Sequence, residues 1–208
     1  MQTGEFIAAF REAFGPVPEL PLLFRYTDEP LRPVEKVGGC FFKVLAQARG
    51  GQPVGLNASN IGCGGGKFYT GFSPMPEFVP QFVSLRERYK QTPEMVLEFI
   101  AALDLRPAPK AWIEFVRVDA AGTFEGAEGV LFFATPDVLA GLVTWAGFDN
   151  DAPDTVAAPF GSGCSTVVSQ AVRENRNGGR RCFLGLFDPS VRPWVGADEL
   201  CFVIPMSR

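Results

Sequence analysis

The stretch of sequence that decides the fold class is KAWIEFVRVDAAGTFEGAEGVLFFATPDVLAGLVTWAG, residues 110–147. Residues 110–118 and 129–135 predict two strands, which a glycine-containing turn joins. Thr-Pro-Asp at 135–137 then places an N-cap, a proline at the first helical position and an acid in the first turn. These signals start a helix that Gly147 ends. Strands and a helix follow one another within this stretch, which indicates mixed α and β structure.

Similar signals continue toward both ends of the chain. The expected helices cover residues 3–14, 40–49, 92–105 and 164–174, and the expected strands cover residues 20–27, 54–58, 181–187 and 199–204, with a short strand near Val156. We therefore predict an α+β fold, in which several helices cover a mixed β-sheet and a single domain spans residues 1–208.

Two segments of the chain echo one another weakly. In each segment a glycine precedes a cysteine and a predicted helix follows, with a valine four residues and an arginine nine residues after the cysteine. The first segment contains Cys40, Val44 and Arg49, and the second contains Cys164, Val168 and Arg173. A duplicated half-domain would explain this match. Chance would also explain it, because glycine, cysteine and valine match easily.

The composition limits the classes of function. Apolar residues make up 47% of the 208-residue chain, which is enough for a sizeable core. The net charge is −4 and Lys and Arg are not clustered, so we expect no nucleic-acid partner. The N-terminus lacks the pattern of a signal peptide, and no run approaches the ~18 apolar residues of a membrane helix. We therefore expect a cytoplasmic protein without a membrane partner, whose cysteines are thiols or metal ligands.

The chain contains no histidine. Mechanisms that need an imidazole are therefore excluded, including the Ser-His-Asp triad, the Cys-His pair and His-ligated zinc. Nucleophilic or metal chemistry has to use Cys, carboxylates, Lys, Arg or the backbone.

The five cysteines fall into two groups. Cys182 and Cys201 lie inside apolar predicted strands, where a thiol behaves as a small hydrophobic side chain. Cys40, Cys63 and Cys164 each follow a glycine and stand in a loop or at a predicted helix start. Outward-pointing backbone N–H groups there would lower a thiol pKa, which favours a nucleophile or a metal ligand.

Three interpretations of this second group stay open. Converging thiolates would suit an iron–sulfur cluster with one open position, or a zinc ion completed by a carboxylate or water. The spacings of 23 and 101 residues contain no CxxC pair, so the sequence favours a second interpretation, ordinary thiols at tight turns. The third interpretation is a single reactive thiol at one of the three positions.

Two loops supply candidate cofactor-binding residues. The glycine run at 62–66 precedes Lys67 but matches neither the phosphate loop nor the dinucleotide fingerprint, so its glycines indicate unusual loop dihedrals. In the second loop, Asp188 begins a predicted turn that Arg192 would anchor by pairing with it, and the same pair could face a ligand. The candidates are Gly62, Gly64, Gly65, Lys67, Asp188 and Arg192.

Three segments resemble the DUF169 family, a bacterial and archaeal group without an established activity. They are CFFKVLAQARGG at 40–51, GCGGGKFYTG at 62–71, and residues 158–205 with APFGSGC, LGLFDPSVRP and DELCFVIP. The resemblance implies a shared fold, cysteines at positions matching Cys40, Cys63 and Cys164, and the Asp-Pro…Arg-Pro turn. It implies no role for Cys182 or Cys201.

Three hypotheses of function follow. The first is a redox-linked protein that holds an iron–sulfur cluster or another metal, such as zinc, through Cys40, Cys63 and Cys164, and meets a redox partner. The second is a small-molecule-binding protein or thiol enzyme, with Cys63 or Cys164 reactive and helix N-termini binding an anion. The third is a non-catalytic assembly module that uses the Phe-rich segment 72–82 as an interface. The sequence does not decide whether the protein is an enzyme.

Overall fold

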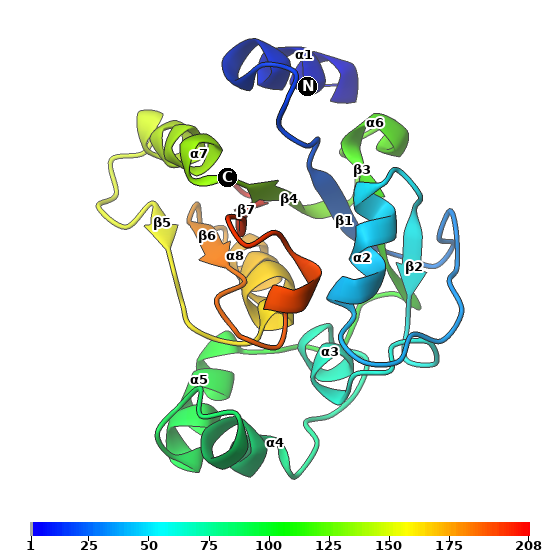
Figure 1. The fold of residues 1–208 in the computed structure, drawn as a ribbon, viewed down its shortest axis with the longest axis vertical. Coiled ribbons are helices and arrows are strands. Elements are labelled where there is room, and N and C mark those ends of the chain that lie inside the picture. Colours follow the sequence, from blue (N-terminus) through cyan, green and yellow to red (C-terminus); the bar gives the residue numbers. More distant parts are fainter. Residues whose placement is uncertain (1) are drawn as a thin grey trace.

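The computed structural model describes residues 2–208, and its centre is one seven-stranded mixed sheet (Figure 1). The strand order is β2-β3-β1-β4-β7-β6-β5, in which β5 and β6 run parallel and the other neighbours run antiparallel. The strands are β1 (Leu22–Thr27), β2 (Val54–Leu56), β3 (Trp112–Arg117), β4 (Ala127–Ala134), β5 (Val156–Ala157), β6 (Cys182–Gly185) and β7 (Leu200–Pro205).

Helices surround this sheet, and several of them are short. The α-helices are α1 (Thr3–Phe14), α2 (Phe42–Arg49), α3 (Gly64–Tyr69), α4 (Val79–Gln81), α5 (Pro93–Leu103), α6 (Val118–Ala121), α7 (Pro136–Phe148) and α8 (Gln170–Arg176). Two five-residue π-helical turns, η1 (Phe82–Arg86) and η2 (Ser165–Ser169), run directly into or out of α-helices, and η3 (Arg192–Trp194) is a 3-10 turn. The predicted α+β fold is therefore confirmed.

The two faces of the sheet have separate cores because neighbouring side chains of a strand point to opposite faces. Leu22 and Phe133 belong to a core that α2, α3 and the η2–α8 segment cover. Leu23 and Phe132 belong to a second core, covered by α1 and α7. Figure 1 shows these two helical layers on either side of the strands, with α4 and α5 beyond α3 and α8. The first layer carries the site described below.

The strand pairing departs from the order of the sequence. β3 and β4 follow one another along the chain, yet β1 lies between them and pairs antiparallel with both. The segment that joins β3 to β4 contains α6 and has room to cross over β1. The N-terminal strand therefore occupies an interior position of the sheet, where all six residues of β1 pair with β3.

Most predicted elements lie within two residues of their expected ends. The predicted helix 164–174 begins with the π-helical turn η2 before α8. The glycine run 62–66 was predicted to have unusual loop dihedrals, and this was wrong, because Gly64 starts α3 and no glycine of the run has a positive φ. Val44 and Val168, the valines of the weak internal echo, both lie in the first core, but the duplication itself stays a prediction. Cys182 and Cys201 are 1% and 0% exposed inside β6 and β7, as expected for core thiols.

A buried ion pair links β1 to β3. Glu114 is fully buried, accepts a hydrogen bond from Arg25 at 2.9 Å and accepts a second from the Leu31 amide at 2.5 Å. Glu114→Ala would leave the guanidinium and the amide without their partner. We expect the free energy of unfolding to fall by about 3 kcal/mol in urea titrations.

An exposed pair provides the control for this measurement. Lys110 and Asp28 form an ion pair at 2.8 Å in which both side chains are more than half exposed. Lys110→Ala should leave the urea midpoint nearly unchanged, because solvent screens such pairs. Equal midpoint shifts for the two variants would contradict the role given to Glu114.

Candidate functional site

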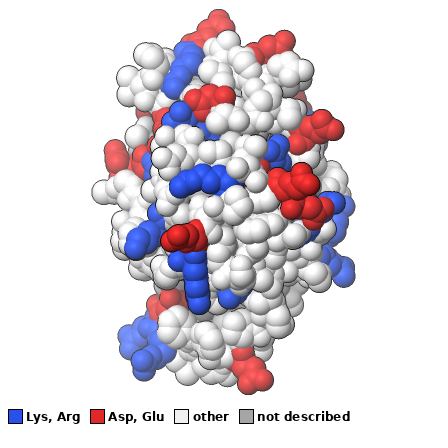
Figure 2. All heavy atoms as spheres, turned by 90° about the vertical axis from the view of Figure 1, so that its right-hand side faces the viewer, with Lys and Arg blue, Asp and Glu red and all other residues white. Residues whose placement is uncertain are grey.

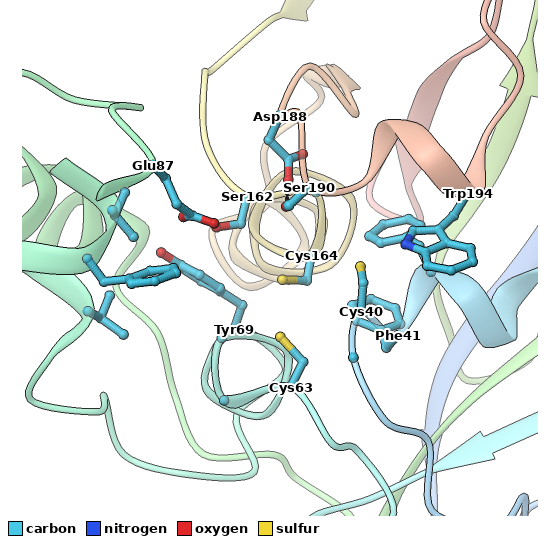
Figure 3. Close-up of a pocket in the computed structure, with 18 of the residues that line it drawn as sticks. Cys40, Phe41, Cys63, Tyr69, Glu87, Ser162, Cys164, Asp188, Ser190 and Trp194 are labelled. Atoms are coloured by element: carbon cyan, nitrogen blue, oxygen red, sulfur yellow. Dashed lines mark hydrogen bonds between the residues drawn. The ribbon is translucent and has the colours of Figure 1, made fainter. Parts of the chain in front are cut away.

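A cavity of about 550 Å³ lies where α2, α3 and the α4–η1 segment meet the loops before η2 and after β6 (Figure 3). All three glycine-preceded cysteines line it. Its wall consists of Gly39, Cys40, Phe41, Phe42, Cys63, Gly64, Gly65, Tyr69, Phe78, Val79, Phe82, Val83, Glu87, Ser162, Gly163, Cys164, Asp188, Ser190, Pro193 and Trp194. The two π-helical turns adjoin this cavity, and such turns are rare and frequently mark functional sites.

Cys40 and Cys63 lie close together because backbone hydrogen bonds join the loop that precedes Cys40 to the loop that precedes Cys63. Val37 and Ile61 form a parallel bridge, and the Val37 amide donates to the Asn60 carbonyl at 2.8 Å. Gly62 lies so close to this bridge that a Cβ there would stand 2.0 Å from the Val37 carbonyl oxygen. Glycine is therefore required at 62 by contact with the protein's own backbone.

A second close approach brings Cys164 to the same cavity. A Cβ on Gly163 would lie 2.8 Å from the Phe42 ring and 3.0 Å from the Leu186 side chain. The chain before η2 is thereby held against the start of α2 and the end of β6. Gly39 has a different role, because its φ of +78° lies in the left-handed region while a Cβ there would meet nothing within 4 Å.

Cys63 is the N-cap of α3. Its Sγ accepts a hydrogen bond from the Gly66 amide at 3.3 Å, and its side chain is half-buried. Gly64 and Gly65 occupy the first two positions of α3 and form part of the cavity wall. The wall beside Cys63 therefore consists largely of backbone.

Asp188 follows β6 and contributes the most deeply buried acid of the cavity. The residue is 1% exposed, and its Oδ2 accepts from the Ser190 hydroxyl at 2.6 Å. Its Oδ1 has no hydrogen-bond partner among the described residues. Leu186, two residues earlier, has a φ of +71°, a strained conformation for a leucine, and it turns the chain toward the cavity.

The pKa values of Cys40 and Cys164 are raised, whereas the sequence predicted lowered values at glycine-preceded cysteines. Burial is the main cause that raises the pKa of Cys40 to about 11, and the nearby Cys63 and Asp188 add to it. Burial also raises the pKa of Cys164 well above its ordinary value, with Cys63, Cys40 and Asp188 as further causes. Each thiol is thus close enough to the others for their charges to interact, and Figure 3 shows the three sulfur atoms gathered at the centre of the cavity.

The two acids and Tyr69 of the wall also resist ionisation. Burial raises the pKa of Asp188, although the Ser190 hydroxyl and the charge of Arg192 oppose this effect. Burial and then the charge of Asp188 raise the pKa of Glu87. Burial likewise raises the pKa of Tyr69, whose side chain bonds to that of Ser162. No Lys or Arg belongs to the wall among residues 2–208, and Arg192, which lies outside the wall, acts on Asp188 through its charge.

Three of the six candidate cofactor-binding residues line the cavity: Gly64, Gly65 and Asp188. Gly62 contacts the Val37 carbonyl instead, and Lys67 lies outside the wall. Arg192 also lies outside it and makes no ion pair with Asp188 in the described structure. The Arg192 guanidinium donates instead to backbone carbonyls of Leu186, Gly196, Ala197 and Glu199. The expected anchoring of the turn is therefore present, but through the backbone.

Sequence reasoning missed five side chains that complete the wall. Tyr69 lies six residues after Cys63 in the same short helix, and Ser162 and Ser190 stand within the motifs of Cys164 and Asp188, so proximity in sequence could have found them. Glu87 and Trp194 carry no comparable signal. Figure 3 shows Glu87 and Tyr69 on one side of the thiols and Trp194 on the other.

The described structure does not bring three ligands to the separation that a single metal ion requires. No group of three His, Cys, Asp or Glu side chains within residues 2–208 meets that condition. The same part of the chain contains no helix that is both long and apolar enough to cross a bilayer.

The fold and the site together define an α+β protein with a thiol-lined cavity on one face of its sheet. Residues 21–208 match the DUF169 family, described as "uncharacterised ArCR", and the chain belongs to this family. The match includes all five cysteines and confirms the resemblance seen in the sequence. No curated protein and no solved structure matches the chain.

The close approach of Gly62 predicts a sharp difference between neighbouring glycines. Gly62→Ala forces the Val37 backbone to move, and we expect a loss of about 1–3 kcal/mol in unfolding free energy. In Gly64→Ala, the new Cβ would lie 3.6 Å or more from its neighbours, which are side-chain atoms, and position 64 is helical. This substitution should be neutral or stabilise by about 0.5 kcal/mol. Urea denaturation of both variants measures the difference, and similar losses would contradict this account.

The raised thiol pKa values predict slow alkylation. At neutral pH, a pKa of about 11 in place of 9.0 lowers the thiolate fraction of Cys40 about a hundredfold. The greater nucleophilicity of a more basic thiolate offsets about half of this effect on a logarithmic scale. Chelator-treated protein should therefore react with iodoacetamide at Cys40 about tenfold more slowly than N-acetylcysteine does, as followed by mass spectrometry.

The charge of Asp188 supplies the internal test of this prediction. Asp188→Asn removes one cause of the raised pKa and should accelerate alkylation of Cys40. Asp154→Asn, at an exposed acid outside the cavity wall, should leave that rate unchanged. A wild-type rate at Cys40 that equals or exceeds that of N-acetylcysteine would overturn the assignment of a neutral thiol.

Proposed function

We propose that this protein holds an iron–sulfur cluster through Cys40, Cys63 and Cys164 and serves a redox function. One observation carries the proposal: three thiols from segments far apart in sequence face one cavity whose described wall contains no Lys or Arg. The glycines before Cys63 and Cys164 make this convergence sterically feasible. Ordinary core thiols need no such convergence.

The electrostatics favour a soft cationic group at the thiols. Burial and mutual repulsion raise the pKa values of Cys40 and Cys164, so thiolates at these positions need a positive partner. The wall offers none. Thiolate-binding metals deprotonate their ligands on binding and would supply the missing positive charge. The thiols of Cys40 and Cys164, which stay protonated without metal, would then bind the metal as thiolates.

The separation of the thiols favours a cluster over one zinc ion. No three ligand side chains in the described chain reach the separation for a single ion. In a cluster the cysteines bind different iron atoms, so the ligands stand further apart. The cavity volume of about 550 Å³ also exceeds what a single ion needs.

A bound cluster would supply one-electron transfer at this position. Cys40, Cys63 and Cys164 would be its protein ligands, and the charge of Asp188 acts on both Cys40 and Cys164. The apolar wall around Phe41 and Trp194 would limit the access of water to that group. A redox partner and a cytoplasmic location stay predictions.

Metal analysis of single variants tests the proposal. Protein purified without oxygen, or reconstituted with iron and sulfide, should contain stoichiometric iron and sulfide and absorb broadly near 400 nm (roughly where thiolate–iron charge transfer falls). Cys40→Ala, Cys63→Ala and Cys164→Ala should each lose most of the iron, because each removes one of three protein ligands.

The two core cysteines provide matched controls. Cys182→Ala and Cys201→Ala remove fully buried thiols that lie outside the cavity, and both variants should keep their iron. Circular dichroism of all five variants separates loss of metal from loss of fold. Full iron content in the three cavity variants, or zinc in place of iron in the native protein, would overturn the cluster assignment.

A second candidate, a thiol enzyme that uses Cys63, has one specific observation in its favour. Cys63 is half-buried in the cavity wall, and its Sγ accepts a hydrogen bond from the Gly66 amide, which fixes the sulfur at the start of α3. Iodoacetamide reaction at Cys63 that is much faster than that of N-acetylcysteine, in protein free of iron, would favour this candidate.

The hypothesis of an assembly module concerns the protein surface beside the cavity. Of the Phe-rich segment 72–82, Phe72 contacts the first core, whereas Phe78 and Phe82 are 59% and 42% exposed at the rim of the cavity. On the face drawn in Figure 2, basic and acidic side chains are interspersed, and no single sign of charge covers it. An interface at this segment stays a prediction.

A further inference from the structure

The cavity extends beyond the region that the three thiols occupy. Its volume of about 550 Å³ lies within the roughly 300–1,000 Å³ that small organic ligands occupy in proteins. The three thiols gather at the centre, which leaves the part between Asp188 and the α4–η1 segment without an assigned occupant. That part has a distinct chemical character.

One wall of this second part is apolar. Phe78 and Val79 from the start of α4, and Phe82 and Val83 from the start of η1, face the cavity. The rings of Phe78 and Phe82 meet edge to face at 5.9 Å and stay partly exposed at the rim. Such a wall favours a hydrocarbon or aromatic body on the ligand.

The opposite wall carries two acids that make no direct ion pair, although Arg192 lies near enough for its charge to act on Asp188. Neither Glu87 nor Asp188 makes an ion pair in the described structure, whose ion pairs all lie elsewhere. The two carboxyls are close enough for the charge of Asp188 to act on Glu87. The Oδ1 of Asp188 is buried with no hydrogen-bond partner, although buried polar atoms are nearly always bonded. The missing partner is a hydrogen-bond donor, and two adjacent acids favour a positively charged one.

We infer that the cavity binds a small organic cation, an amine on an apolar body, with its ammonium group between Glu87 and Asp188. The ammonium would donate to the carboxyl groups of Asp188 and Glu87, both of which belong to the cavity wall. The apolar body would lie against the α4–η1 wall. The two acids disfavour an anionic ligand, whereas the sequence hypothesis of a small-molecule-binding protein expected helix N-termini to bind an anion. This inference does not depend on a cluster at the thiols.

Three probes of one shape test the charge requirement. Benzylamine, benzyl alcohol and benzoate share a ring and differ in charge, and calorimetric titration at neutral pH compares their affinities. Benzylamine should bind most tightly and benzoate should show no binding. Glu87→Gln and Asp188→Asn should each weaken benzylamine about tenfold or more, because each removes a charged hydrogen bond.

Glu77→Gln is the matched control. Glu77 is an exposed acid ten residues before Glu87, outside the cavity wall, and its loss should leave benzylamine affinity unchanged. Benzoate binding as tight as that of benzylamine, or equal weakening by Glu77→Gln and Glu87→Gln, would overturn the inference. So would the absence of binding by benzylamine, phenethylamine and hexylamine alike.

Iron analysis on the same samples separates this inference from the proposed function. Glu87→Gln should keep its iron, because Glu87 is not among the proposed ligands. Iron without amine binding would overturn the organic cation alone. Amine binding without iron would overturn the cluster alone.

Discussion

Burial of both faces of a single sheet is the constraint on which this structure depends. Neighbouring residues such as Leu22 and Leu23 face opposite cores, so helical layers have to cover both sides. The layer of α1 and α7 consists of long elements that close one face. The other face is closed by short helices, π-helical turns and loops, and these irregular elements leave the cavity between them.

Glycines set the shape of that irregular layer. Gly62 and Gly163 allow backbone and side chains to approach more closely than any Cβ would permit, and each approach positions the cysteine that follows. Flexibility is therefore not the common property of the three Gly-Cys pairs. Close contact explains two of them, and a left-handed turn at Gly39 explains the third.

Local signals predicted most of the elements, whereas the site depends on tertiary contacts. Pro93 and Pro136 start α5 and α7 because proline geometry acts within one turn, and the Thr92 side chain also caps α5, whereas that of Thr135 makes no cap hydrogen bond. The position of β1 between β3 and β4 has no local signal, and neither does the approach of Glu87 to Asp188. The expected Asp188–Arg192 pair was wrong because four backbone carbonyls bind the guanidinium instead.

The π-helical turn η2 has a consequence for the angular position of Cys164. An α-helix advances by about 100° per residue, and a π-helical turn contains one residue more than an α-helical turn. Removing one residue from Ser165–Ser169 would regularise the helix and rotate Cys164 by about that angle relative to α8. Its sulfur would then point away from Cys40 and Cys63. The length of the π-helical turn thus sets the direction in which Cys164 points, and this direction decides whether the three thiols share a cavity.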